Sequence, residues 1–307
     1  MTSLIDRQKK ERKIQIFKSA LRFQESAAGV VIQRISGSYL YRILRPLILA
    51  RADAEENGRD PDRVDPRRFN PDRTDPLVNA IYNMDDIFSY CKGKTVDMLA
   101  SAEGVAMEWK EDGAPGHGCL LLAWKTTFDS DTKKLKAPEL VGAMTLHKFK
   151  PTTNFSTDRA SLSDRDYDIL HGKTASGSND IRNYFSRNTM YIDAMCAKGK
   201  GGIGKVLVLH ALRWALMRKC TGLIALSFSK RSLRSGEHPE SYPLFTTFKF
   251  EKTIPTANFK VQMYGTWFFQ SLDTIGFGNI MKEAVDICTR TGFTEKTEDT
   301  LIWRCPN

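Results

Sequence analysis

The clearest pattern of apolar and polar positions lies in the second half of the chain. Residues 190–196 (MYIDAMC) form a short apolar run typical of a buried strand, and apolar residues recur at helical spacing from about 203 to 219. A turn rich in glycine and lysine joins the two. Glycines let the backbone approach a ligand closely, and the first amides of a helix have no internal partners. The order therefore predicts a strand, an anion-binding turn and a helix, with phosphate as the commonest ligand of such a turn.

Other apolar runs predict the elements around this unit. A helical stripe occupies Asp75–Gly104, and a polar loop of about 39 residues, Lys150–Asn188, precedes the strand at 190–196. Strand-like runs occur at Cys119–Phe128, Glu139–Phe149, Gly222–Ser229 and Val261–Phe269. Alternating strands and helices in this order predict an α/β domain.

The glycine turn is open to several interpretations. Gly199–Lys205 has the G-x-x-x-x-G-K spacing of nucleotide P-loops, but Val206 stands where a Ser or Thr would hold magnesium. Gly199, Gly201 and Gly204 also have dinucleotide-fold spacing, although the repeated strand–helix units of that fold are missing around them. A turn without any ligand is a further alternative.

A third interpretation uses more of the chain. The pattern Gly199-x-x-Gly202-x-Gly204, followed by an apolar helix, resembles the acyl-CoA-binding motif of the GNAT acetyltransferase superfamily. The flanking runs follow in the family's order over about residues 76–270. The resemblance implies a mixed, mainly antiparallel central sheet flanked by helices, with acetyl-CoA as cofactor. It also implies transfer of an acyl group, most simply acetyl, to an amine acceptor that the sequence does not specify.

The resemblance also implies which residues hold the cofactor. In that family the strand before the glycine turn lends main-chain N–H groups to the acyl-pantetheine arm, and the turn holds the pyrophosphate. Lysines around the turn stand in for an Arg or Gln that the motif has at Gly199. The expected cofactor-binding residues are Ala194, Met195, Cys196, Lys198, Lys200, Gly201, Gly202, Gly204 and Lys205.

Candidate catalytic groups lie on the same strand. Asp193 is the first candidate for the base that accepts the amine proton, and Tyr191 shares its face of the strand. The Tyr that protonates the thiolate in this family is replaced by Phe245, or by Cys288 if Val285–Phe293 is the matching helix. Tyr242 is the nearest substitute. These departures support an alternative function, a catalytically inactive domain that serves as a scaffold subunit.

Positive charge is concentrated at the start of the chain. Residues 1–51 contain 11 Lys and Arg against 3 Asp and Glu, so they carry +8 of the total net charge of +10. The nearly neutral remainder gives no strong nucleic-acid signal. Residues 1–50 are predicted to form a basic helical extension, within which residues 25–45 resemble a degenerate IQ motif. That motif binds calmodulin-like proteins, so residues 5–45 are expected to dock on such a partner, on the chain's own domain or on a larger assembly.

The remaining boundaries follow from composition. Residues 51–75 are polar, with a proline every fifth position, and predict an extended linker. Residues 76–270 form the predicted acyltransferase domain, and 271–307 a C-terminal helix and strand that complete or flank it. Six scattered cysteines without C-x-x-C pairs indicate reduced thiols in a cytoplasmic compartment, and no cysteine–histidine cluster predicts a metal site. No apolar run is long enough to span a bilayer.

Overall fold

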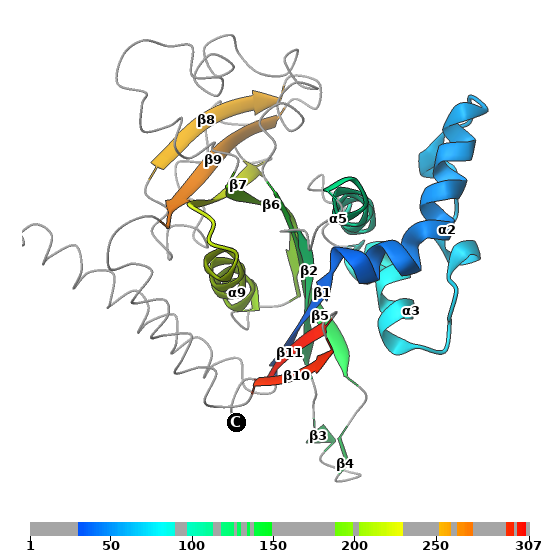
Figure 1. Cartoon of the computed structure of the whole chain (residues 1–307), viewed down its shortest axis with the longest axis horizontal. Coiled ribbons are helices and arrows are strands. Elements are labelled where there is room, and N and C mark those ends of the chain that lie inside the picture. Colours follow the sequence, from blue (N-terminus) through cyan, green and yellow to red (C-terminus); the bar gives the residue numbers. More distant parts are fainter. Residues whose placement is uncertain are drawn as a thin grey trace, which may run out of the picture. The chain divides into compact units, whose positions relative to one another are not determined.

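The structure is a computed structural model of the whole chain (Figure 1). It describes residues 30–89, 97–112, 118–125, 128–129, 134–135, 138–148, 188–198, 203–229, 252–258, 263–272, 293–297 and 300–304. The chain divides into two compact units. Unit 1 contains Lys148–Asp193 and Gly204–Thr291, and unit 2 contains Gly29–His147, Ala194–Ile203 and Gly292–Asn307. The domain boundaries predicted from the sequence at residues 51 and 76 do not coincide with a boundary between these units. The predicted mixed α/β fold with a mainly antiparallel sheet is confirmed.

Unit 2 is built on antiparallel strands. Strand β1 (Val30–Ser36) pairs with β11 (Thr300–Arg304) on one side and with β2 (Cys119–Lys125) on the other. Beyond β11 lies β10 (Phe293–Thr297), and β2 pairs in turn with β5 (Glu139–Lys148). A separate two-stranded hairpin joins β3 (Phe128–Asp129) and β4 (Lys134–Leu135). The two strands β2 and β5 are the hairpin predicted from the apolar runs at 119–128 and 139–149.

Helices cover one face of these strands. In Figure 1, α2 (Gly37–Glu56), α3 (Pro76–Tyr82) and α5 (Met98–Asp112) lie together beside β1 and β2. The short helix α4 (Met84–Ile87) follows α3. Their apolar side chains form a single core with residues of the strands, because each helix has one apolar stripe to bury. The centre of that core is fully buried at Leu40, Leu44, Leu47, Ile81, Met84, Leu99 and Leu120.

The segment predicted as an extended linker folds as a row of tight turns. Each of four Asx-Pro pairs places an Asp or Asn side chain as acceptor for the main-chain N–H two residues later, at distances of 2.7 to 3.1 Å. Proline fixes φ at the first position of each turn, which explains the five-residue repeat. The turns begin at Asp60, Asp65, Asn70 and Asp75, and they produce the 3₁₀ helices η1 (Pro61–Arg63) and η2 (Pro66–Phe69) and the start of α3.

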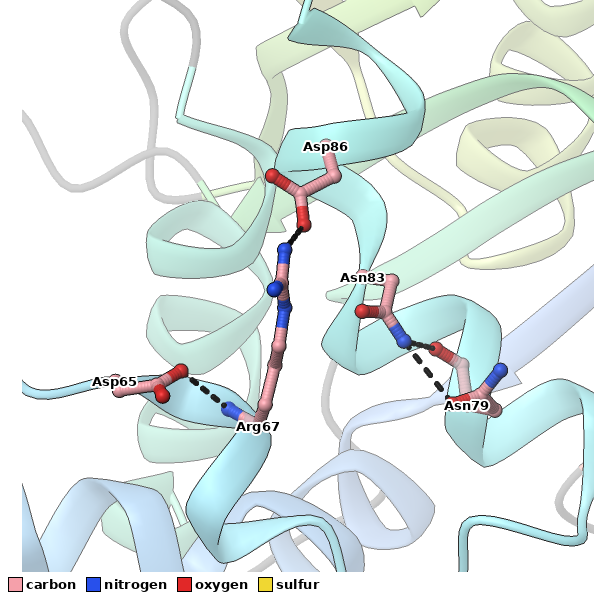
Figure 2. A network of polar contacts seen from close by, with 5 residues as sticks. All are labelled: Asp65, Arg67, Asn79, Asn83 and Asp86. Atoms are coloured by element: carbon pink, nitrogen blue, oxygen red, sulfur yellow. Dashed lines mark hydrogen bonds and ion pairs between the residues drawn. The ribbon is translucent and has the colours of Figure 1, made fainter.

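Side chains attach this row of turns to the helices of unit 2. Val64 and Phe69 pack against the helical core. Figure 2 shows the polar attachment, in which the guanidinium of Arg67 is hydrogen-bonded to the carboxylate of Asp86 while its main-chain N–H donates to Asp65. The same figure shows the amide of Asn83 donating to Asn79, one turn earlier. The segment therefore belongs to unit 2.

Strand β1 corrects the prediction of a continuous helix over residues 25–45. Ile32 and Ile35 are buried in a strand that pairs on both edges, and Gln33 accepts a hydrogen bond from the indole of Trp124 on β2 at 2.9 Å. Only from Gly37 does the chain become helical. The helix expected over Val30–Ser36 is therefore a strand, while the resemblance of residues 25–45 to an IQ motif stays a prediction. The basic stretch at residues 5–23 lies outside the described residues.

The strand–helix–strand order that the sequence predicted is present along residues 189–229. Strand β6 (Thr189–Ala197) leads through the glycine turn to α9 (Ile203–Met217) and then to β7 (Gly222–Ser229). Strands β6 and β7 are parallel, and β7 pairs antiparallel with β9 (Met263–Ser271), followed by β8 (Lys252–Asn258). The predicted helix ends two residues earlier than expected, where Lys219 adopts a positive φ of 56°.

Two further expectations concern the whole chain. Among the described helices, none combines the length and apolar character that crossing a bilayer requires. Cys119 and Cys220 are free, buried thiols.

Candidate functional site

Strand β6 carries five of the residues that the sequence nominated, and its two edges differ. On one edge the main-chain N–H of Ala194 donates to the hydroxyl of Thr145 at 3.0 Å, and that of Lys198 donates to the carbonyl of Val141 at 2.7 Å. From Ala194 to Lys198 the residue number rises by four, while the partner on β5 changes from Thr145 to Val141, four residues lower. The two strands therefore run antiparallel, with Ala194 opposite Thr145. Even-numbered residues of β6 therefore direct their N–H groups toward β5.

Odd-numbered residues of β6 direct their N–H groups to the other edge. There the pairing with β7 covers Thr189–Ile192 and ends with Ile192 opposite Ala225, although β6 continues to Ala197. The N–H of Met195 consequently lies beyond the last residue that pairs with β7. An extended ligand can add to such a strand edge through main-chain hydrogen bonds.

This alternation separates the three expected main-chain donors. Met195 presents its N–H to the edge beyond the β7 pairing, whereas Ala194 and Cys196 present theirs toward β5. The three N–H groups therefore do not all face one edge of β6, and their contact with an acyl-pantetheine arm stays a prediction. Ala194 and Cys196 place their side chains in the helical core of unit 2 instead.

Asp193 and Tyr191 are brought together as the two-residue spacing predicts. Asp193 is exposed, while Tyr191 is buried and hydrogen-bonded to the Asp193 carboxylate. Burial, and then the charge of Asp193, raises the pKa of the Tyr191 phenol well above its usual value. Tyr191 therefore remains protonated and orients the carboxylate as a hydrogen-bond donor.

Only part of the predicted phosphate site lies among the described residues. Gly204 and Lys205 form the first turn of α9, a position where main-chain N–H groups point out of the helix. The ammonium of Lys198 is paired with the carboxylate of Glu139, and both side chains are more than half exposed. Lys200, Gly201, Gly202 and Tyr242 lie outside the described residues.

Sequence reasoning missed a buried polar chain between α5 and β5. The hydroxyls of Ser101 and Thr145 are 2.5 Å apart, and Ser101 Oγ lies 3.3 Å from His147 Nε2. His147 Nδ1 in turn lies 3.4 Å from an oxygen of Glu108. Thr145 is fully buried, and Ser101 and Glu108 are less than a tenth exposed. The alternation of Thr145 and His147 on β5 was visible in the sequence, but their partners come from a helix about 40 residues earlier.

A second buried ionisable group lies on α5. Glu103 is 11% exposed, and its carboxylate lies 3.0 Å from the guanidinium of Arg51 on α2. Burial raises the pKa of Glu103 to about 7, assisted by the negative charges of Asp97 and Asp85 and opposed by Arg51. Burial outweighs the attraction of Arg51, so the carboxyl takes up a proton near neutral pH.

Comparisons with known proteins complete the description. No family model matches the chain, and no curated protein matches it. Among solved structures, an N-acetyltransferase from Staphylococcus aureus Mu50 is similar at 10% identity and a TM-score of 0.35, over 64% of this chain and 94% of that one. A candidate phosphinothricin N-acetyltransferase is similar at 16% identity and a TM-score of 0.31, over 63% and 90% of the two chains. A candidate acetyltransferase from Acinetobacter baylyi ADP1 is similar at 12% identity and a TM-score of 0.36, over 66% and 90%.

Proposed function

We propose that the chain is an acyl-CoA-dependent N-acyltransferase that transfers an acetyl group from acetyl-CoA to an amine. The observation that carries the proposal is that the parallel pairing of β6 with β7 ends partway along β6. The strand stops pairing with β7 at Ile192, continues for five residues and enters the glycine turn before α9. A strand edge that extends past its described pairing with β7 and is followed by the start of a helix suits a ligand with an amide-bearing arm and a phosphate group.

The residues present fit this cofactor. The N–H of Met195 would hold the arm along the edge of β6, and the main-chain amides of the glycine turn, Gly204 and Lys205 would hold the pyrophosphate. Acetyl-CoA would supply an acyl group already activated as a thioester. Lys198 contributes positive charge nearby only after release from Glu139, because the two side chains are paired in this structure.

The proposed chemistry assigns one role to each group on β6. Asp193 accepts the proton that the amine loses as its nitrogen bonds to the acyl carbon, directly or through one water molecule. Tyr191 orients the Asp193 carboxylate through their hydrogen bond. The Met195 N–H donates to the acyl oxygen as negative charge develops there. The departing thiolate takes its proton from solvent or from Tyr242.

Calorimetric binding of acetyl-CoA to the full chain tests the proposal. The full chain is needed because β1 and α2 belong to the core of unit 2. Micromolar binding that the Gly202→Asp, Gly204→Asp double variant abolishes supports the cofactor site on the turn. A folded wild-type chain that does not bind acetyl-CoA would overturn the enzymatic function and favour the inactive scaffold. Circular dichroism melting of both proteins is the control for folding.

A further inference from the structure

We infer that Thr145, Ser101, His147 and Glu108 are positioning residues for the acyl-binding edge of β6. This inference rests on the proposed function and names residues that the glycine motif does not contain. None of the four side chains is assigned contact with acetyl-CoA. They act on the main chain of Ala194, the residue immediately before the proposed donor Met195.

The contact between Thr145 and Ala194 is the first step. Thr145 Oγ1 lies 3.0 Å from the nitrogen of Ala194 and 3.4 Å from its carbonyl oxygen, so one hydroxyl contacts both polar atoms of that residue. The carbonyl of Ala194 and the N–H of Met195 belong to one planar trans peptide and point in opposite directions. Fixing Ala194 on the β5 side therefore fixes the direction of the Met195 N–H on the other side.

The chain of contacts ends at Glu108. His147 lies between Glu108, 3.4 Å from its Nδ1, and Ser101, 3.3 Å from its Nε2, so both ring nitrogens have a polar neighbour. The hydroxyls of Ser101 and Thr145 share a hydrogen bond at 2.5 Å, and the Thr145 hydroxyl also faces the Ala194 carbonyl at 3.4 Å. The Thr145 oxygen accepts from the Ala194 N–H.

Burial restricts the movement of these four polar side chains. Thr145 is 0% exposed and Ser101 7% exposed, so neither hydroxyl can replace its partner with bulk water at low cost. Main-chain donors must stay within about 0.5 Å of the productive position to act on a reacting carbonyl. The buried series of polar contacts from Glu108 to the main chain of β6 provides that support.

The test compares the affinities of acetyl-CoA and CoA, because only the first has the acyl oxygen. Thr145→Val in the full chain keeps the side-chain volume and removes the hydroxyl. We expect CoA affinity to be unchanged and the ratio of acetyl-CoA to CoA affinity to fall about fivefold, the effect of one hydrogen bond. Thr145→Ser should restore the ratio. Thr189→Val, which removes a buried hydroxyl on β6 itself, should leave the ratio at the wild-type value.

The outcomes separate this inference from the proposed function. A wild-type chain that binds neither ligand overturns both. A wild-type chain that binds both, with an unchanged ratio or an equal loss of both affinities in Thr145→Val, overturns only the positioning role. If Thr145→Val does not fold, Ser101→Ala is the second test, because it keeps the Thr145 hydroxyl and removes the Ser101 hydroxyl that contacts it. A ratio lowered about twofold then supports the inference, and an unchanged ratio refutes it.

Discussion

The buried carboxyl of Glu103 should make the stability of the protein depend on pH. Its pKa is raised from 4.5 to about 7 in the folded chain, chiefly by burial against the attraction of Arg51. At about 1.4 kcal/mol per pH unit, this difference corresponds to at most about 3 kcal/mol of free energy of unfolding. Below pH 4.5 the carboxyl is neutral in the folded and unfolded states. Between about pH 4.5 and pH 7 the carboxyl ionises in the unfolded chain but stays protonated in the folded chain, so stability falls across this range and levels off above it.

Glu103→Gln tests this reasoning. The quantity to compare is how much the free energy of unfolding changes with pH, because its value at a single pH is not informative. The variant leaves Arg51 without its carboxylate, so its stability at any single pH mixes two effects. We expect wild type to lose up to about 3 kcal/mol more than Glu103→Gln between pH 4.5 and pH 8, measured by urea unfolding with tryptophan fluorescence. Glu55→Gln, an exposed position on α2, is the matched control and should behave as wild type.

One result would refute the argument. If wild type and Glu103→Gln show the same change in unfolding free energy between pH 4.5 and pH 8, Arg51 keeps Glu103 ionised throughout. The attraction of the ion pair would then outweigh burial, and the assigned direction of the pKa shift would be wrong.

Further predictions concern packing and the proposed cofactor site. Gly37→Ala should lower the free energy of unfolding by about 1–3 kcal/mol in urea melts, because its Cβ would lie 2.7 Å from the Cβ of Trp109; no destabilisation would show that α2 and α5 can separate freely. Tyr82→Phe should cost about 1 kcal/mol in the same assay, because the buried hydroxyl donates to an α2 carbonyl at 2.6 Å; an equally stable variant would contradict that bond. Glu139→Gln should tighten acetyl-CoA binding two- to fivefold in calorimetry at low salt, since it releases the ammonium of Lys198, and Lys198→Gln in the same background should abolish the gain.

The sequence by itself determined the elements whose signals are local. Apolar runs and the glycine turn predicted β6, α9 and β7 to within a few residues, and the hairpin of β2 and β5 followed from two apolar segments. Asp193 and Tyr191 were placed on one face because side chains in a strand alternate. The prolines at 61, 66, 71 and 76 marked the positions of turns, although the turns fold onto unit 2 instead of forming an extended linker.

Only the tertiary structure decided how distant segments pair. Residues 30–36 have apolar positions compatible with a helix or a strand, and they become a strand because β11, some 270 residues later, and β2 pair with its two edges. The same holds for the donors on β6, since the roles of Ala194 and Met195 depend on where the pairing with β5 and β7 lies. Thr145 and Ser101 meet because a helix packs on a strand about 40 residues away. Local propensity carries no information about these pairings, which depend on long-range burial and hydrogen bonding.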